Sequence, residues 1–405
     1  MSHTLSVREI PIAHRRVFVR VDFNVPLEAG RIADDTRLRA ALPTLRLLLD
    51  GGASIVLASH LGRPKGKPKP DASLRPVAAR LQEMLGRPVI LAPDCVGEEV
   101  EQMARALAPG GLLLLENLRF HAEEERNDDG FARRLAALGE VYVNDAFGAA
   151  HRAHASVAAI AAHLKPAAAG LLMDREIGML SRLRDRPEKP YVALLGGAKV
   201  SDKIDLIEHL LERVDAILVG GAMAYTFLKA AGVSVGGSRV EADRVDAARD
   251  TAARAEERGV RLLLPIDHVV ADGPEPGRPS EATPGAAIPD GRVGLDVGPR
   301  TRDVFAQELA HARTVFWNGP LGLFEVPPYD QGTLAAARAI AAAEGIFSVV
   351  GGGDSVAAIT RLGLADRFAH VSTGGGASLE FLSGLELPGV AALDTAPGDA
   401  PVAVR

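Results

Sequence analysis

The stretch with the clearest chemical signature is residues 347–359, where an apolar strand leads into Gly351-Gly352-Gly353-Asp354 and then into a helix. Glycines let a backbone approach a ligand closely, and the first N–H groups of a helix have no partner inside it. Such a turn suits a phosphate group. Because a carboxylate repels phosphate, Asp354 is better explained as a ligand of Mg²⁺ between the protein and the phosphate oxygens. For this stretch alone, an ordinary capped strand-to-helix turn is an equally good interpretation.

The same half of the chain offers further candidate phosphate ligands. Lys199 and Lys203 follow the Gly196-Gly197 turn, and their spacing predicts that Lys203 lies one turn along a helix, within reach of a phosphate. Lys199 either contacts the transferred phosphate or binds a loop carbonyl. The stretch does not read GxxxxGK[ST], and no GxGxxG with a downstream acid occurs, so both common nucleotide fingerprints are absent from the sequence. We also assign to the nucleotide site the strand-end residues Gly220, Gly221 and Asn318.

The first half of the chain instead collects cations at strand ends and at the helix starts after them: Arg37, His60, Arg63, Arg119, His151 and Arg152. Arginine forks bind carboxylate and phosphate bidentately, so we expect a small ligand that carries both groups. Asp22 and Asn24 are available for its hydroxyl. We expect His60 to bind the anion rather than to act as an acid or base, because phosphoryl transfer to a carboxylate removes no proton.

These residues need a scaffold in which strands and helices alternate. Apolar strands that end in polar residues are predicted at 17–25, 53–59, 112–115 and 141–143, with helices at 34–50, 74–85 and 129–138. Arg20, Asp22 and Asn24 fall on the polar face of the first strand. The pattern restarts with strands at 192–195, 216–219, 260–265, 314–317 and 370–372 and in the strand before Gly351. This alternation is typical of parallel sheets, whose ligands bind beyond the carboxyl ends of the strands.

The predicted fold is therefore α/β, with two doubly wound, mainly parallel-sheet, Rossmann-like domains that face each other across a cleft. We expect an N-terminal anion-binding domain at residues 1–166, an interdomain helix at 167–185 and a nucleotide-binding domain at 186–386. The Pro/Gly-rich residues 272–290 are an excursion within the second domain, and the tail at about 387–405 is expected to pack back on the first. Hinge candidates are the 167–185 helix and the turn Thr373–Gly376.

Composition excludes several functional classes. A net charge of −6 gives no polybasic signal for nucleic acid or membrane binding. A single cysteine, Cys95, rules out an internal disulfide and a cysteine-based zinc site and favours the cytoplasm. Cys95 has no histidine near it in the sequence, so we expect a buried thiol rather than a nucleophile. Residues 1–16 resemble no signal peptide, no apolar run is long enough to span a membrane, and nothing asks for more than a monomer.

Five stretches in order along the chain resemble the phosphoglycerate kinase family: VRVDFNVP at 19–26, SHLGRP at 59–64, GGAKVSDK at 196–203, WNGP at 317–320 and GGGD at 351–354. The resemblance runs from about Ser6 to Leu393. It implies reversible phosphoryl transfer between 1,3-bisphosphoglycerate and ADP, giving 3-phosphoglycerate and MgATP, by direct in-line transfer after hinge closure. Such a transfer needs alignment and positive charge but no covalent nucleophile, and Arg37, Lys203, Mg²⁺ and the N–H groups after Gly352 would supply them.

The resemblance also implies a role for each matching residue. The triose acid would be held by Asp22, Phe23, Asn24, Arg37, His60, Leu61, Gly62, Arg63, Arg119 and Arg152. The nucleotide would be held by Lys203, Glu325, Gly352, Gly353, Asp354 and Ser355, with Asp354 on the metal. The catalytic group would be Arg37, Lys203, Gly352 and Gly353. Ser355 stands where threonine is commoner in the family, and the chain beyond Asp394 is longer than the resemblance leads us to expect.

Three alternatives remain at this stage. Another carboxylate or carbamate kinase would share the nucleotide half but need a different anion pocket. A dehydrogenase is disfavoured by the missing dinucleotide fingerprint. A catalytically silent nucleotide-binding or scaffolding protein on the same frame would be expected to lack Lys203 or Asp354, and both are present.

Overall fold

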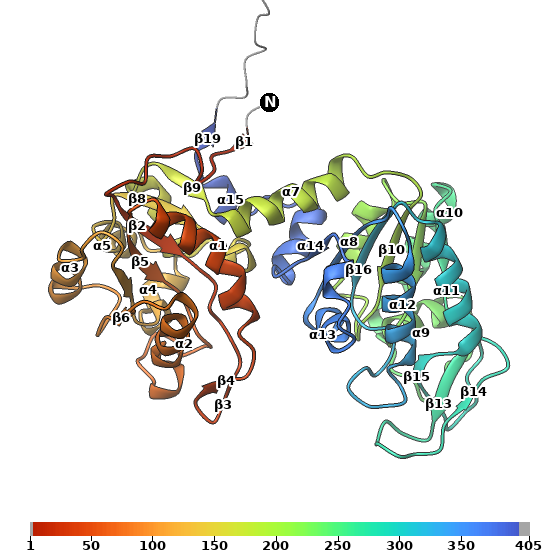
Figure 1. Cartoon of the computed structure of the whole chain (residues 1–405). Coiled ribbons are helices and arrows are strands. Elements are labelled where there is room, and N and C mark those ends of the chain that lie inside the picture. The colour runs from red at the N-terminus through yellow and green to blue at the C-terminus, as the bar shows by residue number, and fades with distance from the viewer. Residues whose placement is uncertain (1–2, 397–405) are drawn as a thin grey trace, which may run out of the picture. The chain divides into compact units, whose positions relative to one another are not determined.

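The computed structural model describes residues 3–396 (Figure 1). The chain forms two compact units, one made of the chain up to Gly178 together with the segment from Glu386 onward, the other of Met179–Leu385. The boundary falls within helix α7 (Leu171–Asp185), which therefore contributes residues to both units.

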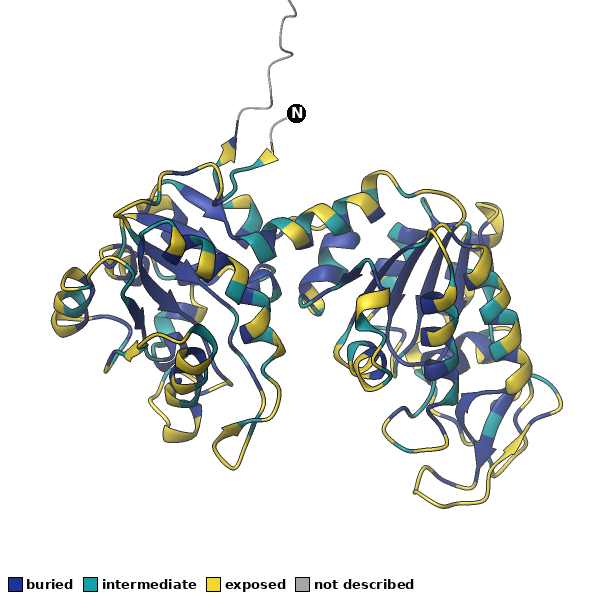
Figure 2. Ribbon diagram, viewed as in Figure 1, coloured by how far each residue is buried: buried dark blue, intermediate teal, exposed yellow. Residues whose placement is uncertain are grey.

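The first unit is built on a six-stranded parallel sheet in the order β6-β7-β5-β2-β8-β9. Its strands are β2 (Arg16–Arg20), β5 (Ser54–Ala58), β6 (Ile90–Leu91), β7 (Leu112–Leu114), β8 (Val141–Asn144) and β9 (Ala167–Ala169). The helices are α1 (Thr36–Asp50), α2 (Arg75–Leu85), α3 (Glu98–Arg105), α4 (Ala122–Glu125), α5 (Asp129–Ala136) and α6 (Ile160–His163). Strands β5, β7 and β8 are buried throughout, as a parallel sheet covered on both faces requires (Figure 2).

The segment from Glu386 returns to this unit. Helix α15 (Pro388–Ala391) is attached to this unit by a hydrogen bond from Gly389 N to Ala150 O at 2.8 Å. Strand β19 (Thr395–Ala396) pairs with β1 (His3–Thr4). Asp394 forms an ion pair with Lys165. Residues 397–405 of the predicted tail lie outside the described residues.

The second unit repeats the architecture with a six-stranded parallel sheet in the order β12-β11-β10-β16-β17-β18. Its strands are β10 (Tyr191–Leu195), β11 (Ala216–Val219), β12 (Arg261–Leu263), β16 (Thr314–Asn318), β17 (Phe347–Gly351) and β18 (His370–Val371). The helices are α8 (Ile204–Leu210), α9 (Met223–Ala230), α10 (Val245–Glu257), α11 (Pro299–His311), α12 (Gln331–Ala342), α13 (Gly353–Arg361) and α14 (Gly376–Leu382). The predicted fold class, two doubly wound parallel-sheet domains, is thus confirmed for each unit.

Two local predictions were wrong. The helix expected over 167–185 begins at Leu171, because residues 167–169 are small, buried alanines that add strand β9 to the sheet edge. The strand expected over 17–25 leaves the sheet after Arg20. Residues 272–290 lie within the second unit, as predicted, and contain β14 (Glu281–Ala282), an edge strand of an antiparallel sheet with β13 (His268–Ala271) and β15 (Val293–Val297) that was not predicted; the two residues of β14 carry too little pattern to predict.

Asp145, which accepts hydrogen bonds from the first turn of α7, makes the folding stability depend on pH. Asp145 Oδ1 accepts hydrogen bonds from Leu172 N at 2.9 Å and Met173 N at 3.2 Å, and burial raises the pKa of Asp145 to about 6. The folded state therefore holds this proton more tightly than the unfolded chain does. The resulting stabilisation is complete below about pH 4 and is lost as the pH rises through about 6, by up to about 3 kcal/mol.

Asp145→Asn keeps an acceptor oxygen but cannot ionise. We expect its free energy of unfolding, relative to the unchanged protein, to increase by up to about 3 kcal/mol between pH 4 and pH 7. Urea unfolding followed by far-ultraviolet circular dichroism measures this difference. Tryptophan fluorescence is unsuitable, since the single tryptophan, Trp317, lies in the other unit. A difference that does not change with pH would show that Asp145 titrates normally.

Candidate active site

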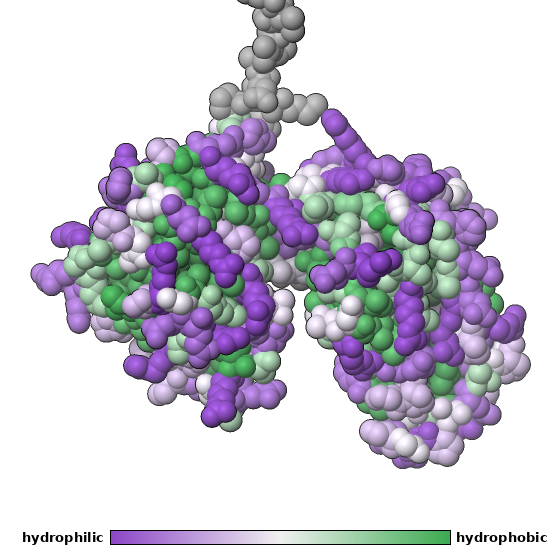
Figure 3. Space-filling view, viewed as in Figure 1, coloured by the Kyte–Doolittle hydropathy of each residue, from purple (hydrophilic) through white to green (hydrophobic). Residues whose placement is uncertain are grey.

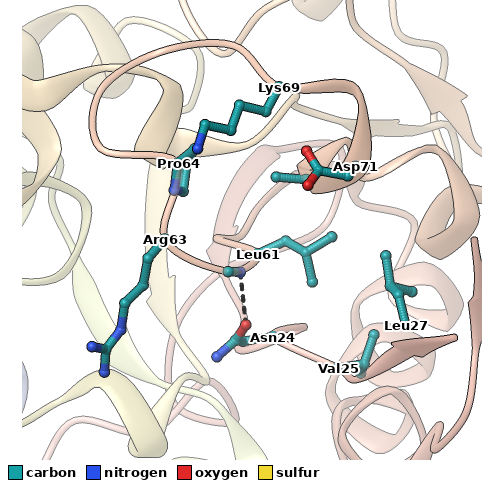
Figure 4. Close-up of a pocket in the computed structure, with 10 residues that line it drawn as sticks. Asn24, Val25, Leu27, Leu61, Arg63, Pro64, Lys69 and Asp71 are labelled. Atoms are coloured by element: carbon teal, nitrogen blue, oxygen red, sulfur yellow. Dashed lines mark hydrogen bonds between the residues drawn. The ribbon is translucent and has the colours of Figure 1, made fainter.

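In the first unit, the predicted ligands of the triose acid follow the carboxyl ends of neighbouring parallel strands. Asn24 lies beyond β2, Gly62 beyond β5 and Arg119 beyond β7. Asn24 Oδ1 accepts from Gly62 N at 2.9 Å (Figure 4), and Arg119 Nη1 donates to Gly62 O at 2.8 Å. The three strand ends are therefore tied together through one peptide segment, as the parallel-sheet argument predicted.

Asp22 connects two further predicted ligands. Its Oδ2 pairs with Arg37 Nη1 at 2.8 Å, and its Oδ1 lies 4.0 Å from His60 Nε2. The Arg37 side chain is 37% exposed, and the Asp22 side chain is 11% exposed. One carboxylate thus orients a partly exposed guanidinium whose other donors have no hydrogen-bond partner among residues 3–396.

His60 was predicted as one of the cations, but the structure favours its neutral form. Burial, followed by the neighbouring cations Arg20, Arg119 and Arg37, holds the pKa of His60 well below its ordinary value. His60 is therefore neutral at physiological pH, because an imidazolium in this cationic and buried setting would be repelled and desolvated. It can still bind an anion, but as a neutral hydrogen-bond donor.

The three remaining arginines differ in exposure. Arg119 is only 3% exposed and lies 3.2 Å from Glu125, whereas Arg152 is half-buried and donates from Nε to His151 Nε2 at 3.1 Å. Arg63 is exposed and has no hydrogen bond or ion pair with any described residue. It lines a pocket of about 240 Å³ together with Asn24, Leu61 and Gly62 (Figure 4).

Phe23 cannot offer its ring to a ligand in this structure. The ring belongs to the core of the unit and is fully buried, while Phe23 N donates to Ser59 Oγ at 2.9 Å. The Phe23 backbone is also engaged, because its carbonyl accepts from Val25 N at 2.9 Å.

In the second unit, the glycine-rich strand ends pack against each other. Gly196 N donates to Asn318 O, Gly197 N to Pro320 O and Gly221 N to Leu321 O, each at 2.9 Å, and Gly220 N donates to Leu195 O at 2.8 Å. A Cβ at Gly221 would lie 2.6 Å from Gly197 N. Glycine is needed at Gly221 for close approach of backbones, and the N–H groups of Gly220 and Gly221 are used inside the fold.

Lys203 lies at the centre of the candidate phosphate site. The prediction that Lys199 and Lys203 share a helix was wrong, because α8 begins only at Ile204 and Lys203 caps it. The Glu241 carboxylate accepts from Val200 N and from Ser201 Oγ and so holds residues 200–203 in a turn. Lys203 is buried and donates from Nζ to Asn318 Oδ1. Burial lowers its pKa, while Asp202 and Asp354 oppose that shift.

Asp354 stands in the first turn of α13, after Gly352 at φ +89°. Desolvation and the nearby Glu325 raise the pKa of Asp354, and Lys203 lowers it. Two carboxylates and an ammonium group therefore lie within electrostatic range of one another near a helix N-terminus. Carboxylate oxygens are ligands that Mg²⁺ prefers, so the residues fit the predicted metal, and the first-turn N–H groups of α13 fit a phosphate.

Ser355, next to Asp354, connects two segments of the candidate nucleotide site. It is fully buried, and its Oγ accepts from Gly319 N at 2.8 Å. Its hydroxyl thereby joins the start of α13 to the turn that follows Asn318, which explains why serine can replace the commoner threonine.

Cys95 has a histidine neighbour in the fold, although none is near it in the sequence. Among the described residues, Asp94, Cys95 and His121 place one possible ligand atom each within 4.8 Å of one another. His121 is 26 positions away in the sequence, so only the fold reveals the contact. Burial and the Asp94 charge raise the pKa of the Cys95 thiol well above its ordinary value, so the predicted unreactive thiol is the better description.

A parallel α/β unit with cations at its strand ends, and a second with a lysine and two carboxylates at a helix N-terminus, define a two-domain phosphotransferase. The phosphoglycerate kinase family model matches residues 7–385. The chain is 59% identical over 381 residues to the phosphoglycerate kinase of Thermus thermophilus, covering 94% of this chain and 97% of that one. It is 56% identical over 389 residues to that of Moorella thermoacetica, covering 96% and 98%.

Solved structures of phosphoglycerate kinases also match the fold of this chain. Phosphoglycerate kinase from Coxiella burnetii superposes with a TM-score of 0.87 at 42% identity, and that from Pyrococcus horikoshii with 0.85 at 33%, each covering 96% of this chain and 98% of the other. The chain belongs to the phosphoglycerate kinase family. The predicted family, kinase class and nucleotide co-substrate are confirmed.

Among the described residues no helix is long and apolar enough to cross a membrane, and Figure 3 shows hydrophilic side chains spread over the visible face of both units.

Proposed function

We propose that the first unit binds 3-phosphoglycerate and 1,3-bisphosphoglycerate, that the second binds ADP and ATP with Mg²⁺, and that the phosphoryl group passes directly between them. The observation that carries this proposal is the separation of two kinds of site. The cationic cluster of Arg37, Arg63, Arg119 and Arg152 lies in one unit, and the Lys203–Asp354 group lies in the other.

The roles follow from the contacts of each side chain. Arg119 and Arg152 bring fixed positive charge to the strand ends, Arg37 is oriented by Asp22, and exposed Arg63 meets the part of the acid that faces solvent. In the second unit Lys203 is held by Asn318 with its charge near Asp354. Lys203 and the N–H groups of Gly353 and Asp354 stabilise the negative charge that spreads over the transferred group.

Asp354 would hold Mg²⁺, with Glu325 close enough to add negative charge. When bound, the ion neutralises charge on the nucleotide phosphates. Transfer breaks the bond from the acyl oxygen of 1,3-bisphosphoglycerate to phosphorus and forms one from phosphorus to a terminal ADP oxygen. No proton has to be removed from either substrate, which agrees with the absence of a nucleophile–base pair among the residues we assign.

The function is tested by a coupled assay in which purified protein, ATP and 3-phosphoglycerate feed an NADH-linked readout. Oxidation of NADH coupled to the formation of ADP is expected with 3-phosphoglycerate, and replacement of the acid by acetate or carbamate is expected to abolish it. Turnover of acetate or carbamate instead would favour the alternative kinase class.

We further propose that the two units approach each other when both substrates are bound, since in-line transfer needs the attacking oxygen about 3–3.5 Å from the phosphorus atom and needs water excluded. Each substrate alone binds one unit and should favour closure only weakly. Small-angle scattering is expected to give a smaller radius of gyration for the ternary complex than for the free protein. The same radius in free, binary and ternary states of an active enzyme would refute closure. A monomer in the cytoplasm remains our expectation.

A further inference from the structure

A network of fully buried polar groups lies directly behind the candidate triose-acid site. Arg20, the last residue of β2, is 0% exposed, as are Glu124 and Ser156. Arg20 Nε donates to Ser156 Oγ at 2.8 Å, and Ser156 Oγ donates to Glu124 Oε1 at 2.5 Å. Glu124 Oε1 lies 4.0 Å from Arg20 Nη2 and gives the buried guanidinium its counter-charge. Buried charges persist only when paired in this way.

The same guanidinium reaches the active-site histidine. Arg20 Nη2 lies 3.1 Å from His60 Nδ1. A guanidinium carries only hydrogen-bond donors, so the imidazole nitrogen that faces it has to be the acceptor. A proton on Nδ1 would instead place two donors against each other in a buried site. The contact therefore excludes both the Nδ1–H tautomer and the doubly protonated ring.

From this geometry we propose that Arg20 is a positioning residue, which locks His60 as the neutral Nε2–H tautomer and so presents one hydrogen-bond donor to the triose acid. The nearest carboxylate oxygen to Nε2, Asp22 Oδ1, is 4.0 Å away, too far for a hydrogen bond. The Nε2 proton is thus available for an oxygen of the substrate. This inference rests on the proposed assignment of the triose acid to the first unit.

The charged groups around His60 agree with a locked neutral ring. Arg20, Arg119, Arg37 and His154 all disfavour an imidazolium at this position, and burial acts in the same direction. Among the residues that the structure describes, Asp22 supplies the only carboxylate oxygen within 4.0 Å of Nε2, and it is already paired with Arg37 at 2.8 Å. Arg20 is also tied to the backbone, because its Nη1 donates to Val21 O. The orientation of the guanidinium is therefore set before any substrate arrives.

The direct test is the tautomer itself, read by long-range ¹H–¹⁵N correlation on protein labelled with ¹⁵N-histidine. The chain has 11 histidines, and loss of one signal set in His60→Gln assigns His60. We expect a protonated Nε2 and an unprotonated Nδ1 that stay unchanged from about pH 5 to about pH 8. A proton on Nδ1, or an imidazolium signal at neutral pH, would overturn the proposal without any variant of Arg20.

The role of Arg20 is tested by Arg20→Lys, which keeps a cation for Glu124 but cannot reach Ser156 and His60 together. We expect a mixture of the two neutral His60 tautomers, and a KM for 3-phosphoglycerate raised about tenfold with the KM for ATP nearly unchanged. The control is Arg16→Lys at the other end of β2, where Arg16 Nε donates to Leu138 O at 2.8 Å. An Arg20→Lys protein whose His60 keeps the Nε2–H tautomer at every pH would show that Arg20 does not set it.

Adding 3-phosphoglycerate to the labelled protein separates this inference from the proposed function. A shift of the His60 Nε2 signal supports a direct hydrogen bond to the acid. An unchanged signal in a protein that turns over 3-phosphoglycerate would overturn the substrate contact of His60, even with the tautomer as expected. A protein that fails to turn over the acid but shows the locked tautomer would contradict the proposed function alone.

Discussion

Asp354→Asn is expected to lower turnover on the order of 100-fold and to weaken MgADP binding, while leaving the affinity for 3-phosphoglycerate nearly unchanged. The substitution keeps the size of the side chain in the first turn of α13 and removes only its charge. With Asp354 neutral, Glu325 is the only carboxylate of the pair left to attract a cation. Calorimetry with MgADP and with 3-phosphoglycerate measures the two affinities, and steady-state kinetics measures turnover.

The matched control for this experiment is Asp366→Asn, which removes an exposed carboxylate from the same unit. We expect its rates and both affinities to equal those of the unchanged protein. Normal MgADP affinity and turnover in Asp354→Asn would remove Asp354 from the metal site. Loss of 3-phosphoglycerate affinity would show instead that the two sites are not separate.

Arg119→Gln is the second substitution with a large expected effect, acting on the other substrate. Arg119 is nearly fully buried and donates to Gly62 O, so its charge acts in a poorly hydrated setting. Removing one partner of a desolvated charge pair costs about 2–5 kcal/mol, which is roughly a 30-fold to 4,000-fold rise in the KM for 3-phosphoglycerate. The KM for ATP should change little.

Arg63 provides the comparison, because we assign it to the same substrate but it is exposed and has no ion pair among the described residues. Arg63→Gln should therefore raise the KM for 3-phosphoglycerate by roughly fivefold or less, as for a solvent-screened contact. Steady-state kinetics of both variants, with circular dichroism to verify folding, decides the point. Equal effects, or a larger effect on the KM for ATP, would mean that these arginines are assigned wrongly.

Much of this site could be predicted from the sequence because strand alternation alone decides which residues meet. Once residues 54–58 and 112–114 are strands of one parallel sheet, Gly62 and Arg119 must approach each other at its carboxyl edge. The same reasoning brought Lys203, Asn318 and Asp354 together in the second unit. These predictions needed only the period of the apolar residues and the polar segments at the strand ends.

The rest depended on contacts between distant segments. The charge of His60 is decided by Arg20, Arg119 and burial, and the sequence shows only a histidine after an apolar strand. Arg20 itself was expected on a polar face and is fully buried, because Glu124 and Ser156 arrive from elsewhere to pair with it. The sequence offered one signal for the burial of Arg20, which is that it follows the apolar residues Val17–Val19 in one strand.

Hydrogen–deuterium exchange with each ligand alone tests the central claim, that each unit holds one substrate. We expect 3-phosphoglycerate to slow exchange in residues 22–24, 60–63 and 117–121, and MgADP to slow it in residues 203–207 and 352–356, with each ligand leaving the other set unchanged. Both ligands together should protect both sets. Protection of residues 203–207 and 352–356 by 3-phosphoglycerate alone, with no change at residues 60–63, would contradict the account.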